Sequence, residues 1–130
     1  MRKRKGAHDK TVDEVVRRLN KNGEYGFIFK EKIYYKSRRQ INPFGEIDAG
    51  GFRLGKKRYG VFVEVKSSNS YKNRKKAIFQ LRRDNRYFTR KFELNRTFML
   101  YAYPTKQGVK YERIKWISIV YFQTQKTKRQ

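Results

Sequence analysis

Apolar residues recur near the start of the chain at the spacing of a helix. Val12, Val15, Val16 and Leu19 are separated by three or four positions, which places them on one helical face. Most positions between them are charged, and a polar residue and a glycine follow the last turn. The pattern predicts a helix from Thr11 to about Lys21 that ends at this glycine.

The rest of the chain alternates between strand-like and helix-like patterns. Short apolar runs between turn residues predict strands over 25–29, 32–35, 46–52, 59–66, 97–103 and 114–122, the first two being separate strands or one bent strand. Ile78, Leu81, Phe88 and Phe92 share one face of a helix predicted over about 71–92. The glycine and basic residues of 55–58 predict a turn, so the strands on either side of it should pair as a hairpin.

The order of these elements, α-β-β-β-α-β-β, predicts an α/β fold with a mixed central sheet flanked by helices. A chain of 130 residues is expected to form one domain with a single buried core. We expect this domain to span residues 11–122. A flexible basic arm is expected at 1–10 and a basic tail at 123–130.

The net charge of the chain limits the kinds of binding partner that we expect. The chain carries 35 Lys and Arg against 11 Asp and Glu, a formal net charge of +24. A field of one sign and this size favours a polyanion, and nucleic acid is favoured over membrane because no basic amphipathic helix stands out. No apolar run approaches the roughly 20 residues of a membrane span, and no apolar stretch follows the basic start, so we expect an intracellular, cytoplasmic protein. A ribosomal or nucleoid packaging protein is the simpler alternative.

The residue types that are missing exclude several kinds of site. The absence of cysteine excludes disulfides, thiolate zinc sites and a cysteine nucleophile. The single histidine, His8, excludes a multi-histidine metal site. Carboxylates in apolar surroundings are therefore the informative residues.

Two short strings place carboxylates in predicted strands. Alternation along 61–66 puts Glu64 and Lys66 on one face and the valines at 61, 63 and 65 on the other. The hairpin brings Asp48 from the neighbouring strand toward them. Taken alone, Asp48 is equally consistent with a salt bridge to one of the many basic residues, and Glu64 with Lys66 is better explained as an ion pair. Together they predict a site for a divalent cation and a water.

The chemistry of Mg²⁺ explains these residue types. Mg²⁺ prefers oxygen ligands and keeps several waters, so one or two carboxylates are enough to hold it. Asp48 and Glu64, with the Val65 carbonyl, are the candidate ligands for Mg²⁺ or Mn²⁺. The ion would lower the pKa of a bound water and stabilise charge on a phosphate, while Lys66 would orient that water or offset the charge.

The string Gly45-Glu46-Ile47-Asp48, followed by Val61-Phe62-Val63-Glu64-Val65-Lys66-Ser67, resembles the PD-(D/E)xK nuclease superfamily. The wording is closest to its small Holliday-junction-resolvase-like members, and the resemblance covers roughly residues 11–103. It implies a restriction-endonuclease-like αβββαβ core and phosphodiester hydrolysis with Asp48, Glu64 and Lys66 as catalytic residues. The proline in the family's name is replaced, because Glu46-Ile47 precedes Asp48.

The resemblance also implies two further catalytic positions. Many members place a glutamate on the first helix, which Glu14 matches by location, although Thr11-Val-Asp-Glu14 is also the pattern of a capping box. Glu24 is the alternative. A glutamine often follows on the next helix, and Gln80 fits, with an exposed surface residue as the other interpretation. The fuller Gln-x-x-x-Tyr motif is absent because Asp84 stands where it requires tyrosine.

Basic residues cluster in three segments that we predict to contact phosphates. They are Arg38 and Arg39 before the first acidic strand, Lys56, Lys57 and Arg58 at the hairpin tip, and Lys72, Arg74, Lys75, Lys76, Arg82, Arg83 and Arg86 on the second helix. Such contacts position a nucleic acid without reading its sequence. Tyr34, Tyr35 and Tyr71 are candidates for stacking on unpaired bases, with a core or rim position as the alternative.

These patterns together predict a small Mg²⁺-dependent endonuclease that acts on DNA. Branched DNA such as a Holliday junction is favoured because no additional domain is available to read sequence. Symmetric cutting of a junction would require a homodimer, for which strand 114–122 and Trp116 could supply the interface. The alternatives are a non-catalytic nucleic-acid-binding protein and a sequence-specific restriction-type enzyme on duplex DNA. RNA stays open as a substrate.

Overall fold

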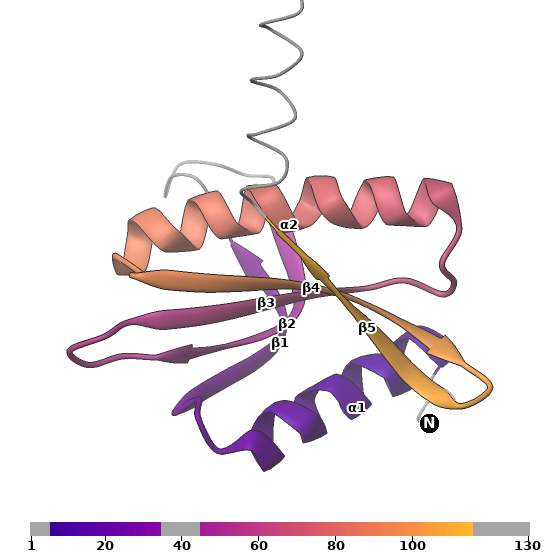
Figure 1. The fold of residues 1–130 in the computed structure, drawn as a ribbon, viewed down its shortest axis with the longest axis horizontal. Coiled ribbons are helices and arrows are strands. Elements are labelled where there is room, and N and C mark those ends of the chain that lie inside the picture. Colours follow the sequence, from indigo (N-terminus) through magenta and orange to yellow (C-terminus); the bar gives the residue numbers. More distant parts are fainter. Residues whose placement is uncertain (1–5, 35–44, 116–130) are drawn as a thin grey trace, which may run out of the picture.

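The computed structural model describes residues 6–34 and 45–115. This part of the chain contains two helices and five strands in the order αβββαββ, which confirms the predicted α/β class (Figure 1). The elements are α1 (Ala7–Asn22), β1 (Phe27–Tyr34), β2 (Gly45–Arg53), β3 (Tyr59–Val65), α2 (Tyr71–Phe92), β4 (Arg96–Thr105) and β5 (Gly108–Ile114). No helix in these two segments is long and apolar enough to cross a membrane.

The five strands form one mixed sheet in the order β1-β2-β3-β4-β5. The β2–β3 pair is the predicted antiparallel hairpin, and β3 and β4 run parallel because α2 carries the chain across one face between them. Figure 1 shows α2 covering that face and α1 lying against the other. Because α2 runs back along the sheet, its first turns lie near the end of β3 that holds the candidate carboxylates.

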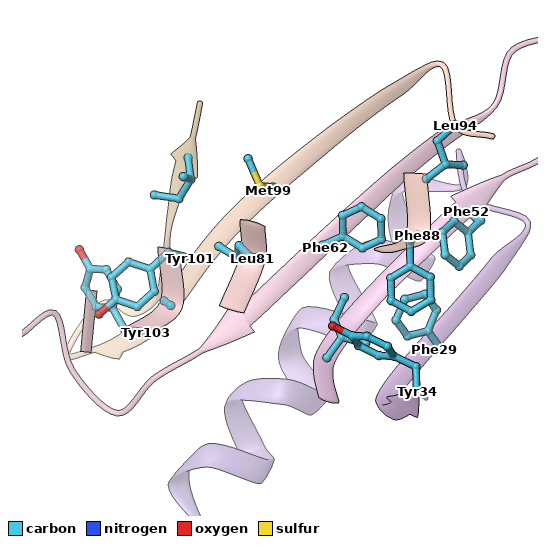
Figure 2. Close-up of a cluster of buried hydrophobic side chains, with 13 residues drawn as sticks. Phe29, Tyr34, Phe52, Phe62, Leu81, Phe88, Leu94, Met99, Tyr101 and Tyr103 are labelled. Carbon is cyan, nitrogen blue, oxygen red and sulfur yellow. The ribbon is translucent and has the colours of Figure 1, made fainter. Parts of the chain in front are cut away.

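Alternation along β3 divides the core into two layers. Val61, Val63 and Val65 share one face, as predicted from the sequence, and this face packs with α1. The residues between them face α2, where Phe62 joins an aromatic cluster that includes Phe88 (Figure 2). Glu64 follows Phe62 on that same face and is therefore carried beneath α2.

Both helices are ended by residues in the left-handed conformation. α1 ends at Gly23, with φ 74°, and this confirms the predicted glycine stop. Ser70 is the N-cap of α2, and its side chain accepts a hydrogen bond from the Asn73 backbone N–H at 3.1 Å. Glu93, with φ 52°, is the C-cap, and the bounds Tyr71–Phe92 match the predicted ones.

The N-terminal boundary was predicted wrongly. Residues 7–10 belong to α1 and not to a flexible arm, so the helix begins one turn earlier than Thr11. The Thr11 hydroxyl donates to the Ala7 carbonyl at 2.9 Å, which places Thr11 inside the helix and rules out the capping box. Gly6 is the N-cap.

The two edge strands of the sheet compare differently with prediction. β1 is one strand, bent at Glu31, whose φ is 49°, and this confirms the single bent strand, one of the two predicted possibilities. The last described strand is β5, which pairs with β4 from Thr105↔Gly108 to Met99↔Ile114, whereas the sequence predicted 114–122. Trp116 and the rest of that predicted strand lie outside the described residues, as do the tail at 123–130 and Arg38, Arg39 and Tyr35.

Gly50 in β2 is required by a close approach of the neighbouring strand. A Cβ at this position would lie 2.5 Å from the Val61 carbonyl oxygen and 2.6 Å from the Phe29 ring. The oxygen cannot move without disturbing the β2–β3 pairing. We therefore expect Gly50→Ala to lower the free energy of unfolding by about 1–3 kcal/mol in a urea titration. Gly55→Ala is the control because nothing lies within 4 Å of its Cβ, and an equal loss in both variants would contradict this explanation.

Candidate active site

The candidate site forms where β2 and β3 separate. Their backbone pairing ends at Ala49↔Val63, whereas β3 stays paired with β4 as far as Val65↔Ala102. Where the two strands separate, a side chain replaces the backbone pairing. The Oδ2 of Asp48 accepts a hydrogen bond from the backbone N–H of Val65 at 2.7 Å. One oxygen of Asp48 is thus fixed to β3, and the residue lines the opening between the strands.

A cavity of about 250 Å³ occupies this opening. It is lined by His8, Glu46, Asp48, Glu64, Val65, Lys66, Ser67, Asn73 and Gln80. The structure therefore brings together Asp48, Glu64, Lys66, Gln80 and Val65, which the sequence placed in one site. A volume of this size has room for several waters at roughly 30 Å³ each, and so for a hydrated cation.

Glu64 is the most buried of these residues, with 1% of its surface exposed. Its Oε1 has no hydrogen-bond partner in the described part of the chain. Burial raises the pKa of Glu64 far above its ordinary value, and its neighbours Asp84 and Asp48 raise it further. The carboxyl group is thus costly to ionise unless a cation joins it, since a buried charge requires a partner.

Asp84 lies behind Glu64 and is fully buried. Its Oδ1 accepts a hydrogen bond from the Tyr34 hydroxyl at 2.5 Å and an ion-pair contact from Arg83 at 3.3 Å. The Arg83 Nε in turn donates to the Tyr34 oxygen at 3.0 Å. This network supports the wall of the cavity from the α2 side.

From the sequence, Asp84 was noted only as the residue that replaces the tyrosine of the Gln-x-x-x-Tyr motif. The signal that could have identified it is its position in the helical stripe, because it lies three and four residues from Leu81 and Phe88, which are both buried. A charged residue at such a position usually has a specific partner. Here the partners are Tyr34, Arg83 and the catalytic candidate Glu64.

His8 was also missed as a site residue. Its Nε2 lies 3.5 Å from the Asp48 Oδ1, the oxygen that does not bond to Val65. The early start of α1 brings it there, since the sequence had assigned residues 1–10 to a flexible arm. His8 therefore contributes an imidazole to a cavity whose other polar side chains are carboxylates, an amine, amides and the Ser67 hydroxyl.

Glu14 and Glu24 do not line the cavity. The Glu14 carboxylate accepts hydrogen bonds from Arg17 at 2.9 and 2.5 Å on the surface of α1, and this pairing lowers the pKa of Glu14. Glu24 is exposed beyond the end of α1. The structure therefore gives Glu14 a surface ion pair and leaves Gln80 as the helix-borne candidate that reaches the site.

The predicted phosphate contacts fall into groups with different surroundings. Lys72, Lys75 and Lys76 are exposed on the first turns of α2, and Arg82 is partly buried farther along it. Arg74 is paired with Glu112 of β5, and Arg83 belongs to the Asp84 network, so both have structural partners.

The hairpin cluster is remote from the cavity. Lys56, Lys57 and Arg58 lie at the other end of β2 and β3, six or more residues from Glu64. At the rise of a strand this separation is about 20 Å. These residues could contact only a part of a long nucleic acid that lies well away from the cavity.

The donor set fits a hard cation. In residues 6–34 and 45–115, no group of three or more His, Cys, Asp or Glu side chains is gathered as a metal site. Two carboxylates suffice for Mg²⁺, which keeps much of its water shell. The Oε1 atoms of Glu64 and Gln80 are both buried and, among the described residues, have no hydrogen-bond partner. A hydrated ion would supply the missing partners.

Comparison with known proteins gives no family assignment. No family model matches the chain, and no curated protein matches it. Proposals about function therefore rest on the residues of this cavity, on the charge of the chain and on the resemblance of its motifs.

Proposed function

We propose that this protein is a divalent-metal-dependent DNA endonuclease of the PD-(D/E)xK type that hydrolyses phosphodiester bonds. The observation that carries the proposal is that Asp48, Glu64, Lys66 and Gln80 line one cavity. The order α1-β1-β2-β3-α2-β4 agrees with the restriction-endonuclease-like core that the resemblance implies. The net charge of +24 suits a polyanionic substrate.

Each residue of the cavity would have a separate role in the reaction. Asp48 and Glu64, with the Val65 carbonyl, would hold Mg²⁺ or Mn²⁺. When bound, such an ion acts as a Lewis acid on the phosphate and lowers the pKa of a bound water. The Lys66 ammonium would donate hydrogen bonds to the attacking water or to a phosphoryl oxygen. Gln80 has a buried oxygen available, among the described residues, to accept a hydrogen bond from a water.

The proposed reaction is hydrolysis of the phosphodiester by a water molecule. A water molecule gives up a proton as its oxygen bonds to phosphorus, the bond from phosphorus to one of its ester oxygens breaks, and that leaving oxygen takes up a proton. Lys66 carries charge of the sign needed to stabilise the extra negative charge on phosphorus in the transition state. In the described part of the chain, Lys66 has no carboxylate within salt-bridge distance, so its ammonium is available for this role.

Branched DNA is the substrate we favour. The described part of the chain forms one sheet covered by two helices, with no separate module to read sequence. A junction resolvase would act as a homodimer with two such sites.

A cleavage panel tests the proposal. Four-way junction, flap, single-stranded and linear duplex DNA are incubated with the protein in Mg²⁺, in Mn²⁺ or in EDTA. We expect cuts only with metal and faster on a branched substrate. A fixed cut sequence on linear duplex would indicate a restriction-type enzyme instead. The absence of cleavage on every substrate, with binding retained, would overturn the proposal.

That last result would favour a non-catalytic nucleic-acid-binding protein. Two observations speak for this alternative: the large excess of basic residues and the contact of Asp48 with His8, in which a carboxylate has a partner without any metal. In that case the acids would serve only to offset nearby positive charge.

A further inference from the structure

The outer face of α2 carries two exposed aromatic rings. Tyr71 is 76% exposed and Phe79 is 69% exposed, the largest values among the exposed large hydrophobic residues of the described chain. A single exposed apolar residue is ordinary, but two on one helix face among cations require an explanation. The opposite face of α2 is occupied by the core residues Ala77, Leu81 and Phe88.

The two rings project from the same side of the helix. They are eight residues apart, which at 100° per residue is a net rotation of about 80° and an axial separation of about 12 Å. Lys75 lies midway, and its ammonium is 5.1 Å from the centre of the Tyr71 ring. Lys72 and Lys76 are exposed on the same stretch. Three exposed lysines thus lie between the two rings along about two turns.

This surface begins at the rim of the candidate active site. Gln80, next to Phe79, lines the cavity, as does Asn73 in the first turn of α2. Lys76 is spaced three residues from Asn73 and four from Gln80, so it lies on the helix surface beside both. A strand bound along α2 would therefore pass the mouth of the cavity.

Aromatic rings interleaved with cations are the combination that binds unpaired nucleotides. Bases stack on the rings whatever their sequence, and the phosphates that follow them are neutralised by lysine. An anionic membrane fits less well, because the apolar side of α2 is buried against the sheet and only separate rings are exposed. The rings would add little to binding of a closed duplex, whose bases are already stacked.

We propose that the outer face of α2 binds single-stranded DNA by stacking bases on Tyr71 and Phe79, so that the candidate nuclease prefers, among branched substrates, those with an unpaired segment beside the cut, such as a flap, over a fully paired junction. The position of the cut depends on the proposed nuclease function, whereas the binding of single-stranded DNA to α2 does not.

The test measures binding without cleavage. Fluorescence anisotropy follows a labelled single-stranded oligothymidylate and a hairpin duplex with the same number of phosphates, in EDTA and over a series of salt concentrations. We expect Phe79→Ala and Tyr71→Ala each to weaken single-strand binding by roughly fivefold or more. Duplex affinity and the slope of log affinity against log salt should stay unchanged. Phe27→Ala, which removes another exposed ring (53%) on β1, is the matched control and should change neither.

A charge variant separates stacking from electrostatics. Lys76→Gln should weaken binding to both DNA forms and lower the steepness of the salt dependence by about 0.7 for the single strand. Unchanged single-strand affinity in both aromatic variants would overturn the proposal. So would an equal loss for the two DNA forms. Binding to anionic phospholipid vesicles that is lost in Phe79→Ala while single-strand binding persists would assign the face to a lipid surface instead.

Failure of the nuclease proposal would look different. If no substrate is cleaved with metal but the aromatic variants still lose single-strand affinity selectively, the proposed DNA-binding role of α2 is supported and the proposed catalytic role is overturned. If junctions are cleaved but the aromatic variants bind normally, the catalytic role is supported and the DNA-binding role of α2 is overturned.

Discussion

Glu64→Gln is expected to abolish cleavage and at the same time to stabilise the metal-free protein at alkaline pH. Loss of a partner that only orients a metal ligand typically costs 10- to 100-fold, so loss of a ligand carboxylate should cost more than about 100-fold in rate. The gain in stability has a separate cause. Glu64 is buried next to two other acids, and its ionised form is disfavoured in the folded protein.

The sign of the pH effect follows from the raised pKa of Glu64. The unfolded chain releases this proton near the ordinary glutamate value of 4.5, whereas the folded protein keeps it to higher pH. The stability that this group contributes is therefore complete below the unfolded value and is lost as pH rises from there toward the folded value. The loss is at most about 1.4 kcal/mol for each pH unit. Glutamine has no proton to lose, so this part of the slope should vanish.

Urea unfolding at pH 5 and pH 8 in EDTA measures both proteins. We expect the wild type to lose more stability between these values than Glu64→Gln, and Mg²⁺ to restore stability to the wild type alone. Glu24→Gln is the matched control, because Glu24 is an exposed carboxylate outside the cavity. Equal slopes in wild type and Glu64→Gln, or normal cleavage by the variant, would contradict the role given to Glu64.

The central part of the site could be predicted because it depends on local rules. The alternation of side chains along β3 predicted that Glu64 points away from the buried valines. The short turn at 55–58 predicted that β2 lies beside β3. Gln80 was predicted as a site residue only from the family resemblance. Its place in the cavity depends on how α2 crosses the sheet, which the local pattern does not determine.

The residues that were missed depend on contacts distant in sequence. Asp84 is noticeable as a polar residue in an apolar stripe, but only the packed helix reveals that Tyr34, fifty residues earlier, satisfies it. His8 was lost because residues 7–10 contain no apolar periodicity, so the pattern could not extend the helix to them. β5 was missed because the more apolar run after Ile114 gave the stronger strand signal, although Val109 and Tyr111 do alternate.

Replacing Asp48 by asparagine and by alanine should separate the charge of this residue from its structural bond. Asparagine keeps an oxygen that can accept the Val65 N–H, the bond that spans 2.7 Å in the wild type. Alanine leaves that buried N–H without a partner, which costs about 1–3 kcal/mol. Both variants lose the negative charge that would hold the cation. We expect both to lose more than about 100-fold in cleavage rate, and Asp48→Ala alone to lose substantial stability.

Cleavage is measured with Mg²⁺ and Mn²⁺ on the best substrate, stability by urea unfolding, and DNA binding by anisotropy in EDTA. Asp9→Asn is the control, because Asp9 also contacts His8, at 3.8 Å, but does not line the cavity. Near-normal cleavage by Asp48→Asn would show that the charge is dispensable and would remove Asp48 from the metal site. A loss of binding as large as the loss of cleavage would instead show that Asp48 acts in holding the DNA, because a metal ligand should be needed for the reaction and not for binding.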